Sequence, residues 1–284
     1  MANHRRFGTL CLAVGFWIAA SAARGATFAF NTGDPDGRMA MGGSNGTEPA
    51  DDFVLDFQTA IDHATFVGLI GSSAQLTDIT GVAVEIYRVF PNDSTDPPSG
   101  RVTTRVNSPS DVGLDSRDSS AATLTFTVSQ LSATFAAGNS VVLGINPLPG
   151  SHTGGDGPVT GQEVLFDVTF TTPFSLAAGH YFFVPQVVVT GGFTWLSAPK
   201  PIVPPGTSFL PDLQTWIRNS DLQPDWLRVG TDIVGGTPAP TFNGAFSLSG
   251  AVTTPPPVPT LGGLGLVALA LSIAAAAVFV LTRR

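Results

Sequence analysis

The chain has 284 residues, of which only 12% are charged, and glycine (32) and proline (23) are abundant. Nine of the 13 basic residues and all 21 acidic residues fall between the two terminal segments, so this body carries a net charge of −12. An acidic body excludes nucleic acid as a partner, because binding to a phosphate backbone requires a basic surface.

Residues 1–23 are predicted to be a signal peptide. Residues 4–6 form a basic start, residues 7–20 are mostly apolar, and small residues precede a cleavage site after Ala22 or Ala23. A retained N-terminal membrane helix is the alternative, although this apolar run is short for a membrane span.

The body, residues 24–252, is dominated by short segments in which apolar and polar residues alternate, and glycine and proline punctuate them. Alternation with a period of two is typical of half-buried β-strands. We therefore expect an all-β fold, a single jelly-roll-like β-sandwich, with the stretch 212–217 as a short helix or a loop. The strands are expected at 27–30, 52–57, 64–70, 82–90, 123–128, 140–145, 163–170, 180–189, 193–196 and 245–252.

The stretch NTGDPDGRM, residues 31–39, is the best candidate for a metal site. Its oxygen donors fall short of the six to eight that Ca²⁺ prefers, so residues from a second stretch would have to join them. The alternative is a plain Asp-Pro-Asp-Gly turn. The candidate calcium ligands are Asn31, Asp34, Asp36, Asp51 and Asp52.

Two tryptophans enclose a polar stretch between residues 215 and 226. Trp216 and Trp226 could stack on sugar rings, and Asn219 and Asp225 could hydrogen-bond sugar hydroxyls. The alternative, which the general behaviour of tryptophan favours, is that both rings pack in the sandwich.

No catalytic motif is found. The single cysteine, Cys11, lies in the leader, so the mature chain should have no thiol nucleophile and no disulfide. His63, His152 and His180 are scattered, and the H-E-x-x-H spacing does not occur. We expect a protein that is not an enzyme, and a secreted hydrolase with unrecognised carboxylates is the remaining alternative.

The C-terminal end predicts a stiff spacer followed by a transmembrane helix. Residues 253–259 are proline-rich, and residues 261–281 form an uncharged run of 21 residues, close to the ~20 that a helix needs to cross a bilayer. The basic pair Arg283 and Arg284 favours a cytoplasmic end, which would place the body outside.

Residues 260–284, with the two residues before them, resemble a C-terminal sorting signal of the IPTL-CTERM type, a relative of PEP-CTERM. This resemblance implies export by a Gram-negative bacterium and recognition by an exosortase-like membrane protease. Glycines follow the motif where family members often carry Ser-Glu-Trp-Gly, which leaves the processing enzyme open. The matching residues are Val258, Pro259, Thr260 and Leu261, then the helix, then Arg283 and Arg284.

The body is also similar to the extracellular β-sandwich modules that accompany such signals, on residues 34–40, 50–53 and 245–252. Together these features predict an exported, surface-sorted protein with a non-enzymatic structural or adhesive role in the envelope or extracellular matrix. The second hypothesis is a carbohydrate-binding module, with calcium as a candidate cofactor and an extracellular polysaccharide as partner. Before processing, the C-terminal helix would hold the chain in the membrane.

Overall fold

The computed structural model describes residues 26–95, 100–145 and 151–253, together with residues 265, 268, 270–273, 275 and 281–282. The predicted signal peptide and the sorting motif at 258–261 and 283–284 lie outside the described residues. Within the part of the chain that is described, no helix is long and apolar enough to cross a membrane.

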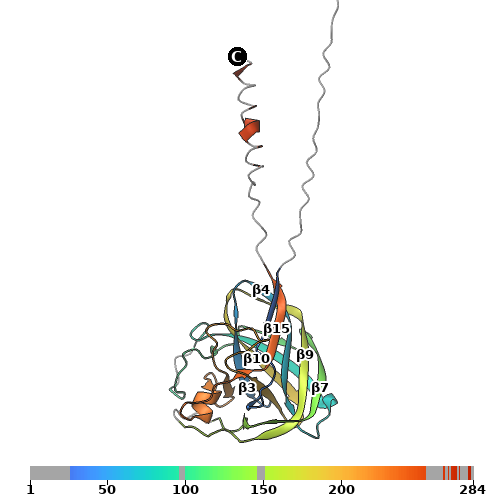
Figure 1. Cartoon of the computed structure of the whole chain (residues 1–284), viewed down its shortest axis with the longest axis vertical. Helices are drawn as coiled ribbons and strands as arrows, with labels where there is room; N and C mark the ends of the chain where they lie inside the picture. Colours follow the sequence, from blue (N-terminus) through green and yellow to red (C-terminus); the bar gives the residue numbers. More distant parts are fainter. Residues whose placement is uncertain are drawn as a thin grey trace, which may run out of the picture.

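Two β-sheets make up the body (Figure 1), and the expected all-β, sandwich-like fold is confirmed. The nine-stranded sheet contains β1 (Thr27–Asn31), β2 (Met39–Gly42), β4 (Thr59–Ile70), β7 (Leu124–Ala137), β8 (Asn139–Val141), β9 (Val159–Leu176), β11 (Phe193–Ala198), β14 (Asn243–Gly244) and β15 (Phe246–Val252). The six-stranded sheet has the order β13-β12-β3-β10-β5-β6. Its strands are β3 (Thr47–Leu55), β5 (Ile79–Arg88), β6 (Asp115–Asp118), β10 (Gly179–Val189), β12 (Trp216–Asn219) and β13 (Leu227–Arg228).

Only two short helical turns interrupt the strands of the described body, η1 (Leu76–Asp78) and the π-helical η2 (Val229–Val234). The stretch predicted as a short helix or loop has no regular secondary structure at residues 212–215 and then becomes β12. The strand expected at 52–57 begins earlier, at Thr47, and ends at Leu55. Polar residues at its start hid it, because they are buried by partners that lie far away in the sequence.

Aromatic side chains fill the space between the two sheets. Phe183 of β10 stacks on Phe246 of β15 with ring centroids 4.9 Å apart, which joins the sheets directly. Phe66 and Phe166 stack at 4.6 Å on neighbouring strands of the nine-stranded sheet. All four rings are nearly inaccessible to solvent, and each such ring contributes a large buried apolar area.

A second apolar layer lies on the outer side of the six-stranded sheet, where loops cover it. Phe182 and Val184 point to this layer from β10, whereas their neighbour Phe183 points to the main core. Trp216 and Trp226 belong to the outer layer too. Because β10 is buried on both faces, its sequence is an almost continuous apolar run rather than an alternating one.

The chain enters the body at the start of β1 and leaves it at the end of β15, and these two points lie at the same end of the body. β1 pairs with β15, and the Val252 amide donates to the Ala26 carbonyl at 2.8 Å (Figure 1). We call this end the near pole. From here β4 runs for 12 residues, about 36 Å at the usual rise per residue, to Ile70 at the opposite end, the far pole.

Candidate functional site: a buried polar cluster beside a cavity

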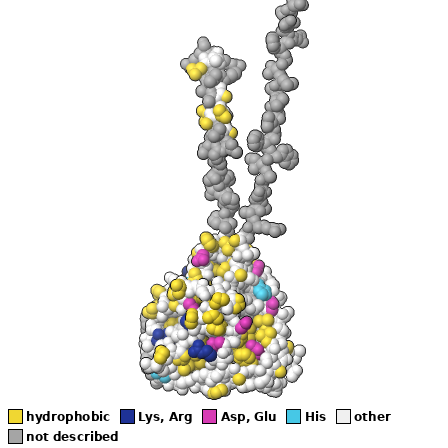
Figure 2. Space-filling model, in the orientation of Figure 1, with side chains coloured by type: hydrophobic (Ala, Val, Ile, Leu, Met, Phe, Trp, Pro, Cys, Tyr) yellow, Lys and Arg dark blue, Asp and Glu magenta, His cyan; other side chains and the backbone are white. Residues whose placement is uncertain are grey.

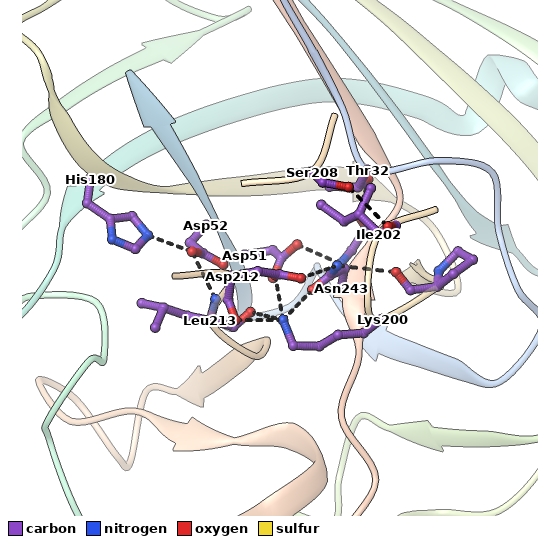
Figure 3. A network of polar contacts seen from close by, with 12 residues as sticks. Thr32, Asp51, Asp52, His180, Lys200, Ile202, Ser208, Asp212, Leu213 and Asn243 are labelled. Carbon is purple, nitrogen blue, oxygen red and sulfur yellow. Dashed lines mark hydrogen bonds and ion pairs between the residues drawn. The ribbon is translucent and has the colours of Figure 1, made fainter. Parts of the chain in front are cut away.

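Two adjacent carboxylates on β3 point to opposite faces of the six-stranded sheet. Asp51 and Asp52 are each only 1% exposed. Oδ2 of Asp51 accepts a hydrogen bond from the Gly244 amide at 2.9 Å, which connects β3 to the nine-stranded sheet. Oδ2 of Asp52 accepts from the Leu213 amide at 3.1 Å and lies 2.5 Å from Nε2 of His180 (Figure 3).

Lys200, the only lysine of the chain, completes this arrangement. Its Nζ donates to Oδ1 and to the main-chain oxygen of Asp212, at 2.5 and 2.9 Å. It also donates to the Leu213 carbonyl at 2.7 Å and to Oδ1 of Asn243 at 3.0 Å (Figure 3). A lysine ammonium has three N–H donors, so these four acceptors use all of them.

We define the polar cluster as Asp51, Asp52, His180, Lys200, Asp212 and Asn243, and residues 199–213 as the cover segment. Lys200 and Asp212 belong to the cover segment, whereas Asp52 and His180 belong to the sheet that it covers. The cluster therefore fixes the cover segment to the sandwich by charge-assisted hydrogen bonds, which are stronger than neutral ones.

Burial governs the protonation of the two carboxyls on β3. Burial raises the pKa of Asp51 well above its usual range, and the neighbouring Asp52 carboxylate raises it further. Burial also raises the pKa of Asp52, although the hydrogen bond with His180 opposes this shift. Oδ1 of Asp51 has no hydrogen-bond partner among the described residues, and an unpaired buried oxygen costs less when the carboxyl is neutral than when it is charged.

A cavity of about 810 Å³ lies beside the cluster and is lined by residues of the cover segment and by Thr241. Its wall is mostly apolar, formed by Pro201, Ile202, Phe209 and Leu210. Lys200 and Asp212 reach this wall, but their polar atoms are engaged with each other. Among the described residues, the side-chain hydrogen bonds of His180 lead to Asp52 and none leads to a hydroxyl group.

The five candidate calcium ligands are not brought together. Asn31 and Asp34 line a cavity of about 400 Å³ that Glu163 also lines. Asp36 instead accepts from the Arg38 amide and from the Ser197 hydroxyl. Within the described ranges no group of three or more His, Cys, Asp or Glu side chains is arranged to hold a metal ion.

Asp51 and Asp52, the other two candidate ligands, are in the polar cluster instead. The charged groups that perturb Asp51 are Asp52, Lys200 and Asp212, and Asp34 is not among them. Among the described residues, Asp51 and Asp52 therefore belong to the polar cluster and are not grouped with Asp34 or Asp36 in a metal-binding arrangement. Glu163, which lines the same cavity as Asn31 and Asp34, was not among the predicted ligands. Burial raises the pKa of its carboxyl, and the negative charge of Asp34 raises it further.

The proposed sugar-binding tryptophans are packed in the outer layer. Trp216 and Trp226 are 1% exposed, so neither offers a ring face to a ligand. The Arg218 guanidinium stacks over the Trp226 ring at 4.2 Å from its centroid. The packing alternative given above is therefore what the structure shows.

The two polar residues of that hypothesis also have structural partners. Oδ1 of Asn219 accepts from the Leu222 amide at 3.0 Å and closes the turn after β12. Asp225 is buried, with its carboxylate 3.1 Å from Nε of Arg105, and Arg105 also forms an ion pair with Asp111. These contacts hold the loops that cover the six-stranded sheet.

Comparison with family models, with curated proteins and with solved structures gives no match.

Proposed function

We propose that the chain is an exported, surface-sorted bacterial protein whose β-sandwich has a non-enzymatic structural or adhesive role at the envelope or in the extracellular matrix. The proposal combines the resemblance of the C-terminal segment to a sorting signal with the shape of the body. In this proposal an exosortase-like protease acts at the segment containing Thr260 and Leu261, and the sandwich has jelly-roll-like connectivity.

The observation that carries the proposal is the position of the two chain connections. β1 and β15 pair with each other, so both connections leave the near pole. A tether at this end would present the far pole, about 36 Å away, to the surroundings. The repeated passage of the chain between the sheets, as in β3-β4-β5 and β9-β10-β11-β12, supports the jelly-roll-like description.

The polar cluster supports a structural role rather than catalysis. Every N–H donor of the Lys200 ammonium has an acceptor, and Asp212, Leu213 and Asn243 provide these acceptors. A catalytic group needs a free position at which a substrate atom can bind. The engaged cluster next to an apolar cavity is better suited to fixing the cover segment.

Carbohydrate binding remains the second candidate, at a different place from the one the tryptophans suggested. A cavity of about 330 Å³ at the far pole is lined by polar side chains of Ser44, Asn45, Thr47 and Thr160 and by apolar ones including Leu143. Hydroxyl and amide groups over an apolar floor suit a sugar. Asn45→Ala should abolish binding on a glycan array, and Asn219→Ala is the matched control.

The test of the first proposal is the mass and location of the protein recovered from its native host. A species that begins near Ala23 and ends between Val258 and Leu261 supports sorting and removal of the helix. Replacement of Pro259 and Thr260 by alanine should then leave the unprocessed chain in the membrane fraction. A wild-type species that retains Arg284 would contradict the sorting role.

A further inference from the structure

β7 is a long edge strand of the nine-stranded sheet. Its 14 residues pair with β9 on one side, and among the described residues no strand pairs with its other side. Figure 1 shows it on the outer flank of the body. The turn η1 contacts β7 without forming a ladder with it.

The other sheet edges of the described body are protected in the usual ways, by short length, by charge or by a covering segment. β8 and β13 have three and two residues, and three of the four residues of β6 are charged. At β1, the Asn31 carbonyl accepts from the Thr207 amide, so the cover segment reaches that edge.

β7 has none of these protections. It contains no charged residue, no proline and no glycine, and the whole run of 37 residues from Ser119 to Gly155 lacks Asp, Glu, Lys and Arg. Its first half is regularly paired, and register shifts occur only after Gln130. A long, regular and uncharged edge is a template for pairing with another strand.

The inner face of this edge is incompletely covered. Phe126 and Val128 lie opposite Val168 and Phe166 of β9 and are only half-buried. They pack against the main core from its border. A strand added beside β7 would cover their open sides and complete their burial, which is favourable at about 25 cal/mol per Å² of apolar surface.

We propose that this edge pairs with the same edge of a second copy of the chain, antiparallel, about a two-fold axis at Thr127. In this register Phe126 lies opposite Val128 of the partner subunit, and Thr125 lies opposite Ser129 of the partner subunit. Aromatic with β-branched residues and hydroxyl with hydroxyl are favourable cross-strand pairs.

Charge indicates a second copy as the occupant. The body carries −12, and acidic side chains are dispersed over the face in Figure 2, so two copies repel each other over most of their surface. The β7 strand itself carries no charge, so this repulsion is weaker along the edge, where the nearest acidic side chain is that of Asp167 on β9, opposite Thr127. A strongly charged partner strand would find no opposite charge on β7. The same edge of a second copy offers uncharged side chains that match those of β7.

Such pairing has a geometric consequence, which rests on the proposed surface function. β7 is antiparallel to β9, and β9 is antiparallel to β4, so β7 runs from the near pole to the far pole. Antiparallel pairing of two copies therefore places their near poles at opposite ends. Two copies tethered to different surfaces would bridge them, and many weak pairs acting together would provide avidity.

Disulfide trapping tests the pairing in the full-length chain with a Cys11→Ala background. A Thr127→Cys variant should form a covalent dimer under mild oxidation, because side chains directly opposite each other lie about 5 Å apart at Cβ. Thr169→Cys is the matched control, since Thr169 is also exposed but lies on the inner neighbour β9. Equal dimer yields from the two variants would overturn the pairing.

A second measurement uses chains that keep Cys11 and carry no introduced cysteine. Thr127→Asp should weaken self-association in sedimentation experiments by about fivefold, because two like charges then face each other across the axis, beside Asp167 of each copy. Thr169→Asp should leave self-association unchanged, and an unchanged value for Thr127→Asp would also overturn the pairing. If Thr127→Cys dimers form but vesicles coated with the protein do not cluster, the pairing holds and the bridging role fails.

Discussion

The buried carboxyl of Asp51 should make the stability of the sandwich fall as the pH rises above about 4. An aspartate in an unfolded chain titrates near pKa 3.9, and burial raises the pKa of Asp51 in the folded state. Between these two pKa values the folded state holds one more proton than the unfolded state. Stability then decreases by about 1.4 kcal/mol per pH unit for this group, and the contribution is fully present only below pH 4.

Asp51→Asn should remove this dependence and retain the fold. The asparagine Oδ1 can still accept from the Gly244 amide, and its NH₂ replaces the carboxyl proton. We expect the slope of unfolding free energy against pH to become flatter by up to about 1.4 kcal/mol per pH unit above pH 4. Urea unfolding at pH 4, 5, 6 and 7, followed by fluorescence of the buried tryptophans, measures this slope.

The control for net charge is Asp221→Asn, because Asp221 is exposed in the turn after β12. It removes the same formal charge without touching the polar cluster. If Asp51→Asn shifts the unfolding free energy by the same amount at every pH, the assigned role of the buried proton is wrong. A variant curve that becomes steeper would refute the sign of the argument.

Lys200→Met should destabilise the fold by about 3 kcal/mol and speed proteolysis within the cover segment, because it leaves buried acceptors unpaired; cleavage as slow as in wild type would contradict it. Trp226→Ala should cost about 3–5 kcal/mol in urea unfolding, whereas Phe57→Ala, at a ring that is 64% exposed, should cost under about 0.5 kcal/mol. Millimolar Ca²⁺ should leave the melting temperature unchanged, since the candidate ligands are dispersed; a rise of several degrees would show a site that these positions do not explain.

The strands of the body were predictable where one face is buried and the other is exposed. The alternation at residues 163–170 marks the middle of β9, and the alternating threonines at 123–128 mark the start of β7. The full lengths of these strands were not predictable. β7 continues to Ala137 through a polar, irregularly paired stretch that has no clear period.

The outer apolar layer and the polar cluster could not be derived from local patterns. The sequence around Trp216 is compatible with a ring that binds a ligand and with a ring packed in the fold. The loops over the six-stranded sheet decide between the two, and local patterns do not predict where these loops lie. Asp52 and His180 are 128 residues apart, and spacing along the chain carries no information about such a pair. The sequence did contain one usable signal, a single lysine in a chain of 284 residues.

The position of β15 between two strands, β1 and β4, determines how the body would respond to a mechanical load. β15 is hydrogen-bonded to β1 on one side and to β4 on the other, and it ends at Val252, next to the predicted tether. Tension between the tether and the far pole would act along the axis of β15. Both ladders would then be sheared at once, so many hydrogen bonds must break together before the strand slides. A pull on β1 alone would meet only one ladder, and so the C-terminal attachment is the one that resists force.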